Sequence, residues 1–348
     1  MDSCQRIINS AAPMRICDLG GWTDTWFAQH GAIVNIGVYP FVQAQMFVRS
    51  RDDQESRINI FAENYGERFS VDDGRLPEGK HALIEAAFSL MRVPDDVAIE
   101  VHLYSDAPAG ASTGTSAALS VALIGALDML TPGRLSPYEA ARVAQRIETE
   151  VLGLQCGVQD QICSAYGGIN YIQMSNYPEA SVSPIHIPNS LWWELESRLM
   201  LVYLGSAHVS SDVHKRVIKN LEASGAEDRR LAGLRQEAER AKNALLCGDF
   251  AKLALAMNAN TEWQRQMHEG LVGKAAETVI ALARRHGAMG WKVNGAGGEG
   301  GSLTLLFGPV GTAKRRFARD LAEAVPQARI IPIYLSRFGL RVWESPAE

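Results

Sequence analysis

Cysteine is scarce in this sequence of 348 residues, and its five copies form no C-x-x-C pair. An odd number of scattered cysteines argues against a disulfide framework or a structural zinc site, so we expect packing residues in a reducing cytoplasm. Dense lysine or arginine tracts are also absent, and the net charge is -5. This balance argues against nucleic acid as the main partner.

Long apolar runs are missing as well. The longest, Ala117 to Leu130, is too short to cross a bilayer and contains Asp128, so we expect no membrane partner. The opening MDSCQRIINS lacks a basic segment followed by an apolar core, and we expect no signal peptide. No Walker loop follows from the glycines near residue 110, and no G-x-G-x-x-G turn follows the first predicted strand, which argues against a P-loop enzyme and a nicotinamide-dependent oxidoreductase.

The length exceeds what one hydrophobic core usually serves and predicts two domains. Strand and helix patterns are mixed without strict alternation, which favours an α+β fold. The polar, proline-containing stretch 175–196 is interpreted as a crossing between domains 1–185 and 186–348. Strands are predicted at 5–18, 32–49, 57–62, 98–105, 169–174, 198–204, 290–294, 303–307, 328–335 and 339–344, and helices at 80–92, from 115, 136–152, 157–166, 211–223, 227–247, 249–268, 272–286 and 311–324.

A glycine- and hydroxyl-rich loop runs into an almost wholly apolar helix from about Thr115. Glycines let a backbone approach a ligand, and a helix start offers unpaired N–H groups to an anion. A plain connection into a core helix explains the stretch equally well. If the loop is functional, its phosphate-binding residues are Pro108, Gly110, Ala111, Ser112, Thr113, Gly114, Thr115 and Ser116.

Three stretches in order resemble the GHMP kinases: RICDLGGWTD at 15–24, the loop at 108–118, and the glycine-rich run 295–301. Asp160 and Gln161 stand between the second and third. The resemblance implies a two-domain GHMP kinase fold, with a ribosomal S5 domain 2-like N-terminal domain and a ferredoxin-like C-terminal domain. It also implies ATP and Mg²⁺ as cofactors, with ATP and the acceptor in the cleft between the domains.

Within the family, LGGWTD, IETEVLG, DQICSAYGG and KVNGAGGEGG look most like the sugar 1-kinases of the D-glycero-D-manno-heptose 7-phosphate kinase group. L-fucose kinases share LGGWTD. The resemblance therefore implies ATP-dependent phosphorylation of the anomeric hydroxyl of a heptose 7-phosphate, with a homodimer allowed for. A kinase of an unphosphorylated sugar, such as L-fucose or galacturonate, and a non-catalytic sugar or nucleotide sensor stay open.

The resemblance assigns catalytic roles to Asp160, as the base, and to Arg15, beside the γ-phosphate. A helix N-cap and a surface ion pair are their respective alternatives. Ser116 and Glu148 match positions that hold Mg²⁺, a hard cation that needs few protein oxygens. A helix cap and an exposed helix residue are the alternatives for these two.

Asp24 matches the sugar-binding aspartate of the family, and its alternative is a turn residue. The other acceptor-binding candidates are Gly21, Trp22, Thr23, His30 and Gln161. At the predicted helix start near 211, Ser210, Ser211, Lys215 and Arg216 could bind the phosphate of the substrate, or form only a capped, solvated helix.

The sequence departs from the family's pattern in two places. In the loop, Ala111, Ser112 and Thr113 replace the family's Ser, Gly and Leu. Ser112 adds a Cβ where the family prefers glycine, so either its φ is negative or nucleotide contact is altered. Glu299 interrupts the third glycine-rich run, and we expect it to face solvent or an internal partner. In that run we expect Gly295, Gly297, Gly298 and Gly301 to approach the nucleotide, Gly297 most directly, although a flexible hairpin is the alternative.

Overall fold

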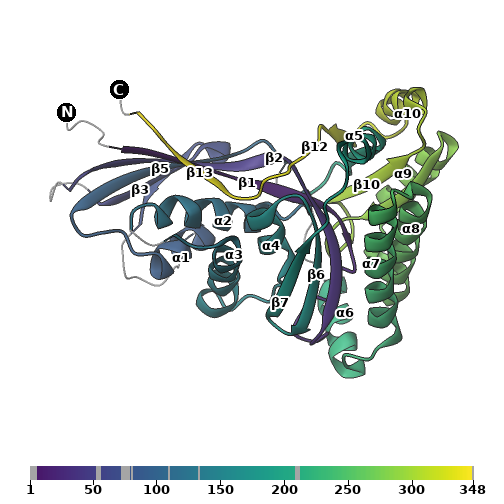
Figure 1. The fold of residues 1–348 in the computed structure, drawn as a ribbon, viewed down its shortest axis with the longest axis horizontal. Helices are drawn as coiled ribbons and strands as arrows, with labels where there is room; N and C mark the ends of the chain where they lie inside the picture. The colour runs from purple at the N-terminus through teal and green to yellow at the C-terminus, as the bar shows by residue number, and fades with distance from the viewer. Residues whose placement is uncertain are drawn as a thin grey trace.

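The computed structural model describes residues 6–51, 56–71, 79, 81–108, 110–131, 134–207 and 212–346. Within these ranges a nine-stranded sheet and a four-stranded sheet organise the fold. The two sheets lie at opposite ends of the long axis of the molecule (Figure 1). The mixture of helices and sheets agrees with the predicted α+β class.

The nine-stranded sheet is built around two long antiparallel strands, β1 (Arg6–Leu19) and β2 (Gly31–Ser50). Every residue of β1 from Ile8 onward is buried, so this strand runs through the interior for almost its whole length. The sheet continues beyond β2 through β5 (Val97–Ser105), β3 (Ile58–Ala62) and β4 (Glu67–Ser70), and the first half of β2 also pairs with β6 (Ile169–Asn176).

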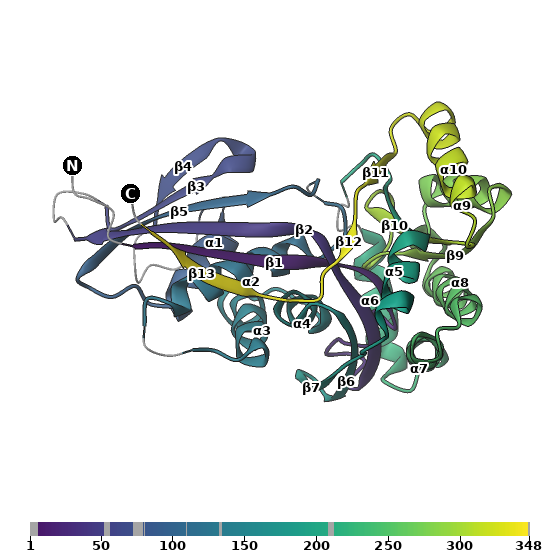
Figure 2. The same ribbon diagram turned by 45° about the horizontal axis from the view of Figure 1, so that its top comes forward.

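Four helices cover one face of this sheet (Figures 1 and 2). They are α1 (Ala82–Leu90), α2 (Thr115–Asp128), α3 (Pro137–Arg146) and α4 (Gln159–Tyr166). Helix α2 is apolar on nearly all sides and is buried from Ala117 to Leu127 except at Leu119, as its composition predicts. Its rigid position fixes the glycine-rich loop that precedes it.

A capping box starts α3, in which the Ser136 side chain accepts from the Glu139 N–H and Glu139 bonds back. The predicted helix does not run uniformly to Leu152, however. It changes to a π-helical turn, η2 (Ile147–Val151), which contains Glu148. Single π-turns inside helices are frequent at functional sites because they redirect side chains.

The four-stranded sheet has the order β11-β8-β10-β9 and is antiparallel. Its strands are β8 (Leu199–Tyr203), β9 (Ala288–Val293), β10 (Ser302–Phe307) and β11 (Arg329–Ile331), and the helices around it are α5 (Asn189–Arg198), α6 (Asp212–Ser224), α7 (Arg229–Cys247), α8 (Phe250–Met267), α9 (Lys274–Arg285) and α10 (Gly311–Ala324). A buried apolar cluster joins the two halves, because Ile16, Val34 and Ile36 of the first sheet belong to the same cluster as Ala241 of α7 and Leu253 of α8.

The end of the chain returns to the first sheet. Strand β12 (Tyr334–Leu335) pairs with β2, and β13 (Arg341–Ser345) pairs with β1. The proposed division at residue 185 stays a prediction, but residues 341–345 lie on the sheet of the N-terminal half.

The stretch 175–196 is more ordered than the sequence suggests. It contains β7 (Glu179–Pro184), which pairs with β6, and the start of α5. The crossing between domains stays a prediction, but β7 and the start of α5 were not predicted within it, because β7 is largely exposed and α5 buries only Trp192 and Leu195. Such elements carry few apolar residues, so their periodicity is weak.

Across the described ranges, no helix combines the length and the apolar character that crossing a membrane requires.

Candidate active site

A cavity of about 500 Å³ lies where the two halves of the molecule meet. Its walls come from segments far apart in the sequence: the end of β1, the loop before α2, the turn η2, the start of α4, helix α6, and the glycine-rich segment after β9. The residues that line it are Arg15, Asp18, Trp22, Asp24, Thr25, Trp26, Phe27, Gly110, Ala111, Ser112, Thr113, Gly114, Thr115, Ser116, Ala117, Glu148, Gln155, Cys156, Gly157, Gln159, Asp160, Gln161, His214, Ile218, Gly295 and Ala296.

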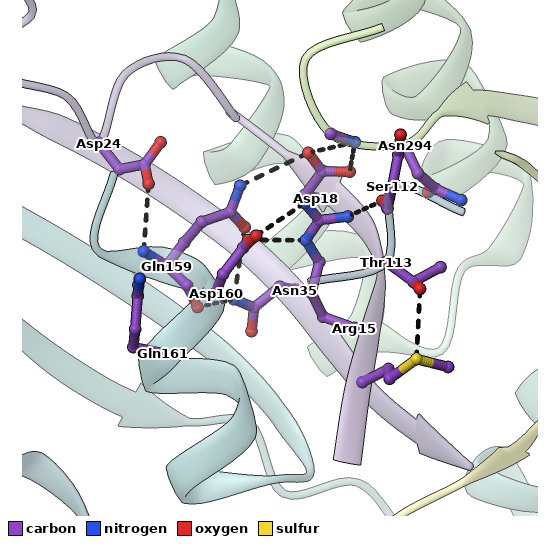
Figure 3. A network of polar contacts seen from close by, with 12 residues as sticks. Arg15, Asp18, Asp24, Asn35, Ser112, Thr113, Gln159, Asp160, Gln161 and Asn294 are labelled. Atoms are coloured by element: carbon purple, nitrogen blue, oxygen red, sulfur yellow. Dashed lines mark hydrogen bonds and ion pairs between the residues drawn. The ribbon is translucent and has the colours of Figure 1, made fainter. Parts of the chain in front are cut away.

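Arg15 and Asp160 form a two-pronged ion pair in this cavity (Figure 3). Arg15 Nε lies 2.8 Å from Asp160 Oδ1, and Arg15 Nη2 lies 3.1 Å from Asp160 Oδ2. The arginine side chain is 5% exposed and the aspartate 30%. Burial lowers the pKa of Arg15, but the charges of Asp160 and Asp18 outweigh this and raise it, so the guanidinium is permanently charged.

Asp160 is the second residue of α4 and does not cap it, since the N-cap position is Val158. The carboxylate faces the loop before α2. A Cβ placed on Gly114 would lie 3.2 Å from Asp160 Oδ2 and 3.3 Å from Arg15 Cγ. The loop tip and the carboxylate therefore meet in one cavity, and a residue larger than glycine would crowd both.

The loop itself is shaped by left-handed backbone at Gly110, Ser112 and Gly114, with φ of 70°, 55° and 70°. Where left-handed residues alternate with right-handed ones, successive backbone N–H groups point toward the same side of the loop. Such a concave group of N–H donors favours the binding of an anion. Ser112 thus has a positive φ, and the negative value allowed for above does not occur. Its carbonyl accepts from Arg15 Nη1, while its buried hydroxyl has no protein partner.

Glu148 reaches the same cavity from the π-turn η2. Its Oε1 accepts a hydrogen bond of 2.7 Å from Gln161 Nε2. Burial, together with the charge of Asp160, raises the pKa of Glu148 to about 7, although the bond from Gln161 opposes the shift. Gln161 has a buried Oε1 without a protein partner, so this pair has capacity for a further ligand.

Ser116, in the first turn of α2, is exposed and lines the cavity with Glu148. No three His, Cys, Asp or Glu side chains gather into a metal cage anywhere in the described ranges. One hydroxyl and one carboxylate beside phosphate oxygens nevertheless suit Mg²⁺, which keeps several water ligands. The donor set fits that ion.

Asp24 holds the start of α4. Its Oδ2 accepts from the N–H groups of Val158 at 3.0 Å and Gln159 at 3.1 Å, so it satisfies the helix start from a distant loop. Burial raises its pKa to about 6 despite these bonds. Gly157 is required here, because a Cβ on it would lie 2.0 Å from Asp24 Oδ2.

Aromatic side chains form the far end of the cavity. Trp22, Trp26 and Phe27 line it, and the ring of Trp22 stacks on His214 of α6 at 6.0 Å between centroids. Trp22 has a φ of 79°, and its buried Nε1 has no protein partner. Positive φ is a strained state for a bulky residue and is found mostly where function requires it.

Sequence reasoning missed Asp18 and Lys292. Both are fully buried, and Lys292 Nζ lies 3.3 Å from Asp18 Oδ1. Asp18 also accepts from the Gly295 N–H, at 3.1 Å to each carboxylate oxygen. The signal for Lys292 was a charged residue inside an otherwise apolar strand, whereas Asp18 stands in the first motif at the end of a strand that also contains Arg15.

Several predicted residues lie outside the cavity lining. His30 lines a separate hollow near α7 and lies 3.7 Å from Glu227, while Lys215 and Arg216 are exposed on α6. The Glu299 carboxylate accepts a hydrogen bond of 3.3 Å from the Lys274 N–H. An internal partner was one of the two outcomes expected for this residue. Also outside the lining are Pro108, Gly21, Thr23 and Gly297, whereas Ser210 and Ser211 fall outside the described residues.

Residues 82–168 match the sequence model of the GHMP kinases N terminal domain. A mevalonate kinase from Pyrococcus horikoshii is 30% identical over 71% of this chain and 70% of the relative. The chain belongs to the GHMP kinase family. A D-glycero-alpha-D-manno-heptose 7-phosphate kinase from Campylobacter jejuni is 28% identical over 97% of this chain and 99% of the relative.

The fold comparison agrees with this membership. The crystal structure of a D-glycero-D-manno-heptose 1-phosphate kinase from Bacteroides thetaiotaomicron superposes with a TM-score of 0.75 at 24% identity, and covers 97% of this chain and 98% of that one. The GHMP kinase fold is therefore confirmed. As a GHMP kinase, this protein is an enzyme that transfers a phosphoryl group from ATP to an alcohol.

Proposed function

We propose that this GHMP kinase phosphorylates the anomeric hydroxyl of a sugar, and that the sugar is D-glycero-D-manno-heptose 7-phosphate. The observation that carries the proposal is the meeting of Asp160, Arg15 and the Gly114 turn in one cavity. Similarity to the Campylobacter jejuni heptose 7-phosphate kinase along nearly the whole chain supports the choice of acceptor.

Asp160 would hold the attacking hydroxyl. Because Arg15 binds both carboxylate oxygens, the carboxylate has one orientation, and its 30% exposed side chain still faces the cavity. Phosphoryl transfer has a loose transition state, so the proton leaves late and positioning matters more than basicity. Asp160 would accept that proton as the new O–P bond forms.

Arg15 and the loop would balance negative charge. The guanidinium is buried and fixed by Asp160 and the Ser112 carbonyl, so it offers a preorganised positive charge without reorganisation. The N–H groups of the left-handed loop and the start of α2 would bind the phosphates of ATP. When bound at Ser116 and Glu148, a magnesium ion would neutralise further phosphate charge.

An unphosphorylated sugar is the second candidate acceptor, and the lining of the cavity favours it. The end next to Trp22 and Phe27 is aromatic and suits the C–H face of a sugar ring, whereas Lys215 and Arg216 lie outside the lining. Asp24 also lines this cavity, and a carboxylate there disfavours a second phosphate.

One screen separates these candidates. ADP release is measured with D-glycero-D-manno-heptose 7-phosphate, mannose 6-phosphate, L-fucose and galacturonate, and the product is characterised by NMR. We expect a 1-phosphate of the heptose. Turnover of L-fucose without turnover of the heptose phosphate would support the second candidate, and phosphate at another carbon would refute the anomeric assignment.

A further inference from the structure

The buried ion pair Asp18–Lys292 connects the end of β1 with the end of β9, 274 residues later in the sequence. We propose that Asp18 is a positioning residue that fixes the Gly295 segment against the phosphate loop, and so aligns Arg15 for phosphoryl transfer. The proposal rests on the function proposed above. Asp18 would act through its neighbours, without touching the reacting atoms.

The contacts of Asp18 bring three parts of the site together (Figure 3). Both carboxylate oxygens accept from the Gly295 N–H, and Oδ2 also lies 3.5 Å from Nε2 of Gln159, the residue before Asp160. The neighbouring residue Cys17 adds a parallel link, because its N–H donates to Asn294 Oδ1 at 3.1 Å. Two adjacent residues of β1 thus bind two adjacent residues after β9.

Gly295 connects the residues bound by Asp18 with the phosphate loop, because its backbone packs against that loop. It has a φ of 64°, and a Cβ on it would lie 3.3 Å from both Arg15 Nη2 and Ser112 Cβ. Its backbone is therefore packed directly against the guanidinium and the loop. Its carbonyl accepts from Gln264 Nε2 at 3.1 Å, so the segment is held from both sides.

The ammonium group of Lys292 offsets the free energy of burying the Asp18 carboxylate. Asp18 and Lys292 are both 0% exposed, and an unpaired carboxylate there would be strongly disfavoured. Lys292 also donates to the Val293 carbonyl, which fixes the ammonium beside Asp18. A hydrophobic pair would fill the same space, yet it could not accept the Gly295 N–H, which the two oxygens of Asp18 share. This requirement explains why charge is kept in the interior.

The test is the double variant Asp18→Leu/Lys292→Met, which removes both charges together with the acceptor of the Gly295 N–H and leaves no buried ion uncompensated. We expect a folded protein whose kcat falls about tenfold or more while KM for the acceptor changes less than about threefold, because the acceptor site is untouched. Affinity for a non-hydrolysable ATP analogue, measured by calorimetry, should weaken at least about threefold.

The matched control is Glu237→Gln/Arg240→Met, which removes another buried carboxylate and its arginine partner, 2.8 Å apart on α7 and outside the cavity lining. It should keep the wild-type kcat. A folded Asp18→Leu/Lys292→Met protein with wild-type kcat and analogue affinity would overturn the proposal. If that variant does not fold, Gly295→Ala tests the same link, and an unchanged kcat and analogue affinity would overturn it.

Failure of the proposed function is distinguishable from failure of this inference. A wild-type enzyme that turns over none of the sugars refutes the acceptor assignment alone. In that case kcat is read with any alcohol that the enzyme phosphorylates, and the analogue affinity of the variants still decides the role of Asp18.

Discussion

Glu148→Gln should make the protein more stable at alkaline pH while it weakens the response to Mg²⁺. Glu148 is a half-buried carboxylate whose Oε1 accepts a hydrogen bond from Gln161, and the charge of Asp160 lies nearby. These surroundings favour its protonated form. Glutamine imitates that form, so the substitution removes the free energy needed to ionise a buried group.

The sign follows from the two pKa values. Burial raises the pKa of Glu148 from 4.5 to about 7 in the folded protein. Its stabilising contribution is thus fully present below pH 4.5 and is lost as the pH rises through about 7. At about 1.4 kcal/mol for each pH unit, the upper limit is about 3 kcal/mol. The pKa of Asp24 is raised as well, but Asp24 is present in both proteins, so its contribution cancels from the difference in their free energies of unfolding.

Urea unfolding at pH 4.5 and pH 8 measures this difference. We expect similar free energies of unfolding for the two proteins at pH 4.5, and a gain of up to about 3 kcal/mol for Glu148→Gln at pH 8. Added Mg²⁺ with an ATP analogue should stabilise the wild type more than the variant. The control is Glu150→Gln, an exposed residue of the same turn that pairs with Arg146. Parallel pH dependence in wild type and Glu148→Gln would refute the reasoning.

Three further substitutions test the reacting groups. Asp160→Asn should lower kcat about 10²–10⁴-fold with little change in KM for ATP, since an amide cannot accept the proton; substantial ADP release would contradict this. Arg15→Lys loses the two-pronged contact, and kcat should fall about tenfold or more; an unchanged kcat would argue against a charge role. In Gly114→Ala, the new Cβ would lie 3.2 Å from Asp160 Oδ2 on a backbone with a φ of 70°, which is strained for alanine. We expect kcat/KM for ATP to fall about tenfold. Gly66→Ala is its control, because φ is 62° there and nothing lies within 4 Å; equal effects would refute the argument.

Local patterns predicted most of the fold. The helix start at Ser136, the buried helix from Thr115 and the strand before Gly295 follow from composition and spacing over a few residues, and each occurs close to where it was expected. Signals of this kind depend only on neighbours in the chain. Gly295 of the third glycine-rich run and Arg15 of the first motif line one cavity with the loop, an arrangement that the resemblance to the GHMP kinases implied and local patterns did not.

Long-range contacts could not be predicted in this way. Nothing near Asp24 in the sequence indicates that it satisfies the start of α4, and nothing near Asp18 indicates Lys292 as its partner. The π-helical turn at Glu148 was not predicted, because a single extra residue in a helix barely alters the spacing of its apolar residues. The chemistry of the candidate site depends on these features, so the sequence supplied its residues but not their electrostatic environment.

The pairing of the last strand with the first has a practical consequence. Ile7 lies opposite Ser345 in adjacent strands, at the end of β1 remote from Arg15. A short peptide joining Ile7 to Ser345 would therefore span little distance, which makes circular permutation at these two residues feasible. Because this end of β1 is remote from Arg15, a surface tether attached beside Ile7 or Ser345 would leave the candidate active site unobstructed for single-molecule or biosensor work.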